Sequence, residues 1–370
     1  MEVEAEESRL DSRTTAVALL FLGLGLAARL LAARAPFFGP DESLFLHIAS
    51  AGDPSEVYRV SLNNAHPPLF PLLLRYWKPL ARSEWQLRLL SVAFGVAFLW
   101  TAYRWSGRLF GKTCGLVTLA FLAFLPSLVI VSSELRGYAL MLWLIAAALL
   151  VLERAFARGS AGELALFTGL AGLSLLTHYA ALWFVLSAFA YAAVRLRGER
   201  RPRPFVLAWA AGQAAIGGLC LFLYRTHISR LRGGPLEQEA KALWLSASYF
   251  RPGQETPLGF LARQTISVFQ FLFSTPVGGV IALGLLSGGI ACLASRRRPS
   301  AVLLVLPFLL SAAAGLAGLY PYGGSRHSID LVPFATAGAG VVLARLSRER
   351  TWIALVVAAV LAPAGFLVGW

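Results

Sequence analysis

The sequence predicts an all-α integral membrane protein, a polytopic helical bundle with about 10–11 transmembrane helices. Of its 370 residues, 57% are hydrophobic and only 14% are charged, whereas a soluble protein carries about a quarter charged residues. The mean hydropathy is +0.66. Several apolar runs also reach the roughly 20 residues that cross a bilayer as a helix.

The predicted spans follow one another from the N-terminus, and each is a predominantly apolar run. We place them at 14–35, 85–106, 112–131, 137–153, 162–177, 179–194, 205–224, 266–294, 301–319, 329–345 and 352–369. The run 266–294 is long enough to allow a break at Pro276, because proline lacks the N–H that an interior helical turn needs. The division at His178 is the least sharply marked of the boundaries.

We expect one transmembrane domain over 14–370, preceded by a short disordered cytoplasmic tail at 1–13. That tail, MEVEAEESRLDSR, is too acidic to begin a signal peptide. Two long loops, 36–84 and 225–265, separate predicted spans. The segments DESLFLHIAS and PPLFPLLLRYWKPL of the first loop predict helices that lie in the membrane interface.

Positive charges gather in every second loop, which predicts the orientation of the chain. They are Arg104, Arg108, Lys112, Arg154, Arg158, the five arginines of RLRGERRPRP (195–204), Arg296, Arg297, Arg298, Arg345, Arg348 and Arg350. Since Lys and Arg remain on the cytoplasmic side, we expect a cytoplasmic N-terminus in the plasma (inner) membrane. The segments expected outside are 36–84, 132–136, the turn at 178, 225–265 and 320–328. The net charge of +14 then suits anionic lipid, and no nucleic-acid partner is expected.

Several common site classes are missing from the sequence. Cys114, Cys220 and Cys292 lie far apart in apolar runs, which predicts no disulfide framework and no paired-cysteine metal motif. The chain has no phosphate-binding GxxxxGK[ST] loop, no GxSxG nucleophile elbow and no HExxH zinc motif.

The polar residues that packing explains least well all fall in or beside loops predicted to face outside. They are Asp41, Glu42, His66, Glu134, Arg136, Tyr138, His178, Arg326 and His327. Ionisable residues near membrane depth are candidates for function. We therefore expect these segments to converge on a single external cavity, which Asp41, Arg136, His178 and Arg326 line.

Each candidate also has a structural alternative. Asp41, after Pro40, could cap the N-terminus of an interfacial helix, with Glu42 favourable in its first turn. His66 could be a turn residue.

Two further alternatives concern the later segments. Arg136 could extend toward lipid headgroups, and His178 could be a hydrogen-bonded turn residue. Arg326 is harder to explain in this way, because it follows the loop Tyr-Pro-Tyr-Gly-Gly-Ser directly and precedes a span.

Six segments in order resemble a known family. They are PDESLFLHIA, AHPPLFPLLL, LRLLSVAFG, SSELRGYALMLW, THYAALWF and YPYGGSRHSIDLVPF. Together, from the first span to about residue 345, they resemble the GT-C glycosyltransferases, specifically the family-39-like enzymes. These include the protein O-mannosyltransferases and the lipid A aminoarabinose transferases. The resemblance implies transfer of a sugar from a polyprenyl-phosphate carrier to a protein, lipid or glycan acceptor at the outer face.

The resemblance also implies roles for individual residues. Asp41 matches the acid at the acceptor and would act as general base, with Glu42 as its support. His66 replaces the lysine of a KPP motif that contacts the donor phosphate, which leaves that role of His66 open. The same departure makes a bound metal less expected. No cofactor is firmly implied, although Glu134, His66 and His178 could supply ligands to a divalent cation.

The chemistry of such a transfer suits the remaining candidates. A sugar that leaves a lipid phosphate puts growing charge on that phosphate, which fixed guanidinium groups stabilise. Arg136 and Arg326 are the expected phosphate ligands, assisted by His327 and by His178. A base on one face of the sugar and a leaving group on the other predict inversion at the anomeric carbon.

Two other classes of function stay open from the sequence. A polytopic transporter or lipid flippase would show paired halves, broken helices near the midplane and charges at span centres. A non-catalytic subunit of an envelope assembly complex is the third possibility. The clustering of charge at one membrane face favours the enzyme over the transporter.

Overall fold

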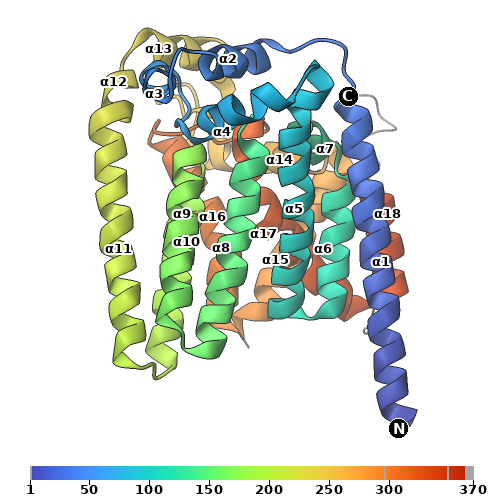
Figure 1. Ribbon diagram of the computed structural model, residues 1–370. Helices are drawn as coiled ribbons and strands as arrows, with labels where there is room; N and C mark the ends of the chain where they lie inside the picture. Colours follow the sequence, from blue (N-terminus) through green and yellow to red (C-terminus); the bar gives the residue numbers. More distant parts are fainter. Residues whose placement is uncertain (1, 296, 348–349, 363–370) are drawn as a thin grey trace.

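The computed structural model describes residues 2–295, 297–347 and 350–362, and within these ranges the chain contains no strand. Long helices stand side by side, and a group of short helices covers one end of the bundle (Figure 1). The short helices are α2 (Pro40–Ala49), α3 (Pro54–Ser61), α4 (Leu69–Trp77) and α13 (Pro235–Ala242). We call this the capped end. The N-terminus lies at the opposite end.

In the part of the chain that the structure describes, eight helical segments are long and apolar enough to cross a membrane. They are Ser12–Ala32 within α1 (Glu2–Ala32), α5 (Glu84–Phe110), α8 (Tyr138–Arg158), α10 (Ala181–Gly198), Arg203–Leu231 from α11 (Arg203–Leu223) to α12 (Ser229–Leu231), α15 (Pro276–Ala294), α16 (Arg298–Leu316), and Arg326–Leu346, made of η4 (Arg326–Leu331) and α17 (Val332–Leu346). Shorter apolar helices are α6 (Lys112–Phe124), α9 (Ala161–Thr177) and α18 (Thr351–Leu361). The prediction of an all-α polytopic membrane protein is confirmed.

Two predicted spans are interrupted. The span 112–131 divides at Leu125 into α6 and α7 (Pro126–Val131). The run 266–294 divides into α14 (Pro257–Leu272) and α15, and the break falls before Pro276, at the start of α15. There the hydroxyl of Thr275 caps α15 by accepting a hydrogen bond from the Gly278 N–H at 2.9 Å.

The boundaries of two other segments differ from the prediction. The span 205–224 continues to Leu231, so the loop 225–265 contains the end of one long helix and the beginning of α14. Helix α1 begins at Glu2, so the segment expected to be a disordered tail is helical. Arg296, Arg348 and the predicted end of the last span, 363–369, lie outside the described residues.

The break between α6 and α7 is stabilised by an arginine from α1. Arg29 is fully buried and donates hydrogen bonds to the carbonyl oxygens of Leu122, at 3.0 Å, and Ala123, at 3.3 Å. The Leu122 carbonyl needs this partner because Pro126, four residues on, has no N–H. Arg29 also donates to the Ser132 hydroxyl at 2.8 Å. The same side chain therefore fixes the break and the start of the loop that follows α7.

The short helices of the capped end are packed onto the bundle. Phe45 and Ala49 of α2 share one buried apolar cluster with Phe70 of α4 and with Leu140 of α8. Leu44, Phe45, Ile48 and Ala49 share one face of α2, and of these four Leu44 alone is exposed, with 42% of its surface accessible. Burying this face attaches α2 firmly to the bundle, which positions the two acids in its first turn.

Candidate functional site

Asp41 lies at the centre of the site, in the first turn of α2. The N-cap of α2 is Gly39, so the alternative that Asp41 caps the helix is wrong. One oxygen of its carboxylate, Oδ2, accepts hydrogen bonds from Nη1 of Arg136 at 2.8 Å and from Nη2 of Arg326 at 2.5 Å. Two segments that the sequence predicted to converge thus meet at this carboxylate.

The two arginines differ in exposure. The Arg136 side chain is only 3% exposed, which excludes the alternative that it extends to lipid headgroups. The Arg326 side chain is 41% exposed, and that of Asp41 is 40% exposed. Asp41 and Arg326 are therefore open to a ligand, while Arg136 supports them from within the protein.

The glycines before Arg326 let its loop lie against α14. A Cβ at Gly324 would approach the Ser267 side chain to 2.4 Å, and one at Gly323 would approach the Gln264 side chain to 2.5 Å. The Gly324 N–H also donates to the Ser267 hydroxyl at 3.1 Å. This close contact fixes the path of the loop and hence the position of Arg326.

Glu42 has a different environment from its neighbour. Arg88 of α5 donates to both of its oxygens, through Nε at 2.7 Å and Nη2 at 2.8 Å. The N–H groups of Leu135 and Gly39 also donate to this carboxylate. Burial alone would raise the pKa of Glu42, but these hydrogen bonds outweigh it and hold the pKa below its ordinary value. Glu42 thus gives structural support both to the start of α2, at Gly39, and to the loop after α7, at Leu135.

Arg88 was missing from the candidates drawn from the sequence. Its other donors bind the carbonyl oxygens of Ala33, Ala35 and Phe37, so it joins the end of α1 to α2. A charge inside the predicted span 85–106 was the available signal, since a charged residue within a span is rarely without a partner.

A stack of rings connects the arginines to the histidines. The guanidinium carbon of Arg136 lies 4.9 Å from the centre of the Tyr138 ring. The ring centres of Tyr138 and His178 are 4.8 Å apart, and those of His178 and His66 are 5.0 Å apart. The candidates from three separate segments are therefore in contact at the capped end.

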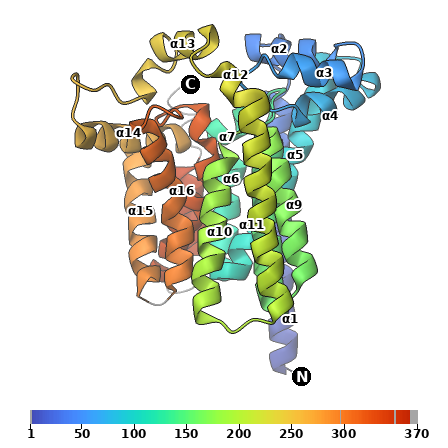
Figure 2. The same ribbon diagram turned by 90° about the vertical axis from the view of Figure 1, so that its left-hand side faces the viewer.

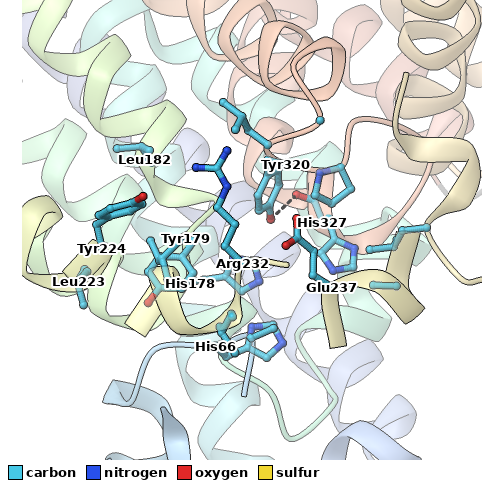
Figure 3. A pocket seen from close by; sticks show the side chains of 18 of the residues that line it. His66, His178, Tyr179, Leu182, Leu223, Tyr224, Arg232, Glu237, Tyr320 and His327 are labelled. Carbon is cyan, nitrogen blue, oxygen red and sulfur yellow. Dashed lines mark hydrogen bonds between the residues drawn. The ribbon is translucent and has the colours of Figure 1, made fainter. Parts of the chain in front are cut away.

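A cavity of about 780 Å³ opens beside this stack. His66, His178 and His327 line it, together with the aromatic residues Tyr179, Trp183, Tyr224, Tyr249 and Tyr320. Figure 3 shows Arg232 among these side chains. Asp41, Arg136 and Arg326 lie alongside this cavity and are not among its lining residues, so the expectation that all four selected residues line one cavity is only partly met.

Arg232 and His227 are two further residues that the sequence reasoning did not select. Buried His227 lies 2.6 Å from the Tyr179 hydroxyl through Nδ1 and 2.7 Å from the Asn64 carbonyl oxygen through Nε2. It thereby connects the segment before His66 to the residue after His178. Both His227 and Arg232 fall within the predicted outer loop 225–265, so position alone could have indicated them.

The histidines of the stack are held neutral. Burial lowers the pKa of His66 well below its ordinary value, and the positive charges of Arg136 and Arg326 lower it further. Burial also lowers the pKa of His178, and the positive charge of Arg136 acts in the same direction. Neutral imidazoles act as hydrogen-bond donors and acceptors rather than as cations.

Glu134 remains close to the centre without a firm partner. Its carboxylate lies 4.0 Å from Nη1 of Arg136, and burial raises its pKa above the ordinary value. Over the described residues, no group of three or more His, Cys, Asp or Glu side chains is arranged to hold a metal ion. Glu134, His66 and His178 therefore do not form the three-ligand group considered above.

Comparisons with known proteins agree with this architecture. Residues 65–223 match a family model described as dolichyl-phosphate-mannose-protein mannosyltransferase. The fold is similar to ArnT from Cupriavidus metallidurans bound to undecaprenyl phosphate, with a TM-score of 0.60 and 16% identity over 96% of this chain and 65% of that one. It is also similar to the oligosaccharyltransferase AglB from Archaeoglobus fulgidus, in complex with an inhibitory peptide and a dolichol-phosphate. That match has a TM-score of 0.58 and 12% identity over 96% of this chain and 55% of the other.

The chain has the GT-C glycosyltransferase fold. The resemblance predicted from the six segments is thus confirmed, in fold over nearly the whole chain and in sequence over residues 65–223. The chain spans about 55–65% of the length of these two solved structures. A comparison with curated protein sequences found no match.

Proposed function

We propose that this protein is a membrane glycosyltransferase that moves a sugar from a polyprenyl-phosphate carrier to an acceptor hydroxyl, amine or amide. The observation that carries the proposal is the Asp41 carboxylate between Arg136 and Arg326, beside the aromatic cavity. The similar structures bind undecaprenyl phosphate and dolichol-phosphate, which favours a polyprenyl-phosphate donor here.

In this proposal Asp41 is the general base. Its Oδ2 is held by the two arginines, and the 40% exposure of the side chain leaves the carboxylate accessible to an acceptor. As the acceptor attacks the anomeric carbon, its proton passes to Asp41, and the bond from that carbon to the phosphate oxygen breaks. Attack opposite the leaving group inverts the configuration of the sugar.

The leaving phosphate needs positive charge that can reach it. Arg326 is half-exposed, and Arg232 is exposed in the cavity and forms no ion pair or hydrogen bond among the side chains that the structure describes. Guanidinium groups bind phosphate bidentately, and they stabilise the charge that develops on it. His66 and His327 reach the same cavity and would assist as neutral donors.

A transfer assay tests the proposal. Membranes that contain the protein receive radiolabelled polyprenyl-phosphate sugars, and the transfer of label is measured. We expect Asp41→Asn to lower turnover by about 10²–10⁴-fold, the usual contribution of a general base. Asp53→Asn changes an exposed acid that caps α3 at the same end and should transfer label at the wild-type rate. No transfer by the wild type, or equal transfer by Asp41→Asn, would contradict the proposal, as would a product that retains the configuration of the donor sugar.

A further inference from the structure

Three side chains at the site have a buried polar atom without a hydrogen-bond partner among the described residues. The atoms are Nε of Arg136, the hydroxyl oxygen of Tyr138 and Nε2 of His178. These residues are 2%, 1% and 4% exposed, respectively. Buried polar groups are nearly always paired, so three unpaired groups in adjacent side chains indicate a place for a polar ligand.

The structure determines which hydrogen His178 offers. Its Nδ1 accepts a hydrogen bond from the Ala180 N–H at 3.1 Å, so the proton of the neutral ring must be on Nε2. Nε2 is therefore a donor, like Nε of Arg136, while the Tyr138 hydroxyl can donate or accept. The set requires a ligand that is rich in acceptor oxygens.

The three groups lie between the base and the cavity. Arg136 contacts Asp41 through Nη1 at 2.8 Å, its guanidinium stacks on Tyr138 at 4.9 Å, and the Tyr138 ring lies 4.8 Å from His178. His178 lines the cavity. In the proposed reaction the sugar must occupy this interval, because its anomeric carbon joins the phosphate to the acceptor.

We propose that Arg136 Nε, the Tyr138 hydroxyl and His178 Nε2 form the subsite that binds the hydroxyl and ring oxygens of the donor sugar. This inference rests on the proposed function. Tyr138 and neutral His178 are uncharged donors beside aromatic rings, and Arg136 adds a donor whose charge is already paired with Asp41. This set suits a neutral sugar, whose hydroxyl oxygens accept hydrogen bonds and whose C–H faces pack on rings. The phosphate is better served by the exposed guanidinium groups of Arg232 and Arg326.

Binding of two kinds of lipid separates sugar recognition from phosphate recognition. Purified protein in detergent is titrated with short-chain polyprenyl phosphate and with polyprenyl-phosphate mannose, glucose, galactose and N-acetylglucosamine. We expect the wild type to bind at least one sugar lipid more tightly than the bare lipid. Tyr138→Phe, which removes only the hydroxyl, should weaken the binding of that sugar lipid by about tenfold. It should leave the affinity for the bare lipid unchanged.

Two variants of His178 test the inferred donor. His178→Gln offers an amide N–H in place of Nε2 and should bind the sugar lipid within a few-fold of the wild type. His178→Leu removes the donor and should weaken the binding of that lipid by about tenfold or more. Arg232→Met should weaken the binding of the sugar lipid and of the bare lipid by the same factor. Thermal unfolding of each variant shows that the comparison is between folded proteins.

The outcomes that contradict the subsite differ from those that contradict the proposed function. If Tyr138→Phe and His178→Leu weaken the binding of both lipids equally, or change the binding of neither, the subsite assignment is wrong. It is also wrong if the wild type binds no sugar lipid more tightly than bare polyprenyl phosphate, although the lipid-phosphate part of the function would then stand. If the wild type binds none of these lipids, the proposed function itself fails.

Discussion

Asp41 and Glu42 are neighbours in sequence but have different chemical environments. Successive residues of a helix point about 100° apart, so Asp41 faces the two site arginines and Glu42 faces Arg88 and two backbone N–H groups. The Glu42 side chain is 7% exposed and that of Asp41 is 40% exposed. One acid is therefore available to a substrate and the other is fully engaged by the protein.

This difference predicts that the two amide substitutions lower the stability of the protein by very different amounts. Glu42→Gln leaves the buried Arg88 charge without its partner, and the loss of one member of a buried ion pair costs about 3–5 kcal/mol of unfolding free energy. Asp41→Asn changes a half-exposed group and should cost less than about 1 kcal/mol. Thermal unfolding in detergent, measured beside the transfer rate, checks both. Similar losses of stability in the two variants would contradict the assignment of Glu42 as a support.

Neutral histidines at the site predict a loss of stability in acid. The pKa of His178 lies well below its ordinary value of 6.5, so on acidification through 6.5 the unfolded chain takes up a proton that the folded chain does not. The free energy of unfolding therefore falls as the pH is lowered from about 7 to about 5.5. Across this pH range, the free energy of unfolding, measured from unfolding curves, should fall less steeply for His178→Gln than for the wild type. The matched control is His47→Gln, at an exposed position of α2. A change of slope as large in this control as in His178→Gln would contradict the assignment to His178.

At the scale of the helices, the apolar runs predicted where helices lie better than where they end. The split of α9 from α10 near His178 was predicted correctly. The divided span of α6 and α7 was read as continuous, because hydropathy does not register Pro126 in an apolar run. The extension of the helix beyond α11 to Leu231 was not predicted. The segment Tyr224–Ile228 is polar enough to suggest a loop, although it is helical in the structure.

The break between α6 and α7 depends on Arg29, which predicts the effect of its removal. Arg29→Met leaves the Leu122 and Ala123 carbonyl oxygens without these donors in the protein interior, at a cost of about 1–3 kcal/mol each. We expect a markedly lower midpoint of thermal unfolding. Arg34→Met, at an exposed position just beyond α1, should change it little. An unfolding midpoint for Arg29→Met equal to that of Arg34→Met would show that the break does not need the arginine.

At the scale of the molecule, the sequence predicted that the site residues gather at one end, and the structure brings them into contact there. Alternation of basic loops and the count of spans were enough to place Asp41, Arg136 and Arg326 on one side of the bundle. The pairing among them was beyond reach, because it depends on rotamers and on helix packing. Arg88 was missed for the same reason, since its partner Glu42 is 46 positions away.

The arrangement of the loops predicts which residues are reachable from outside the cell. Gln254 is exposed in the segment between α13 and α14, and Arg200 is exposed in the segment between α10 and α11. The first segment lies at the capped end and the second at the opposite end (Figures 1 and 2). In a background without the three native cysteines, a membrane-impermeant maleimide added to intact cells should label Gln254→Cys and not Arg200→Cys. Permeabilised cells should label both. The reverse pattern in intact cells would invert the proposed orientation.

The bond between Asp41 and Arg326 joins positions 285 residues apart. At the usual rate of synthesis, about 5–20 residues per second, Asp41 waits roughly 15–60 s on the ribosome before its second arginine exists. Until then the carboxylate can pair only with Arg136, which is 95 positions away. The site therefore closes only after η4 has been synthesised, and a chain whose synthesis stops earlier has an incomplete site.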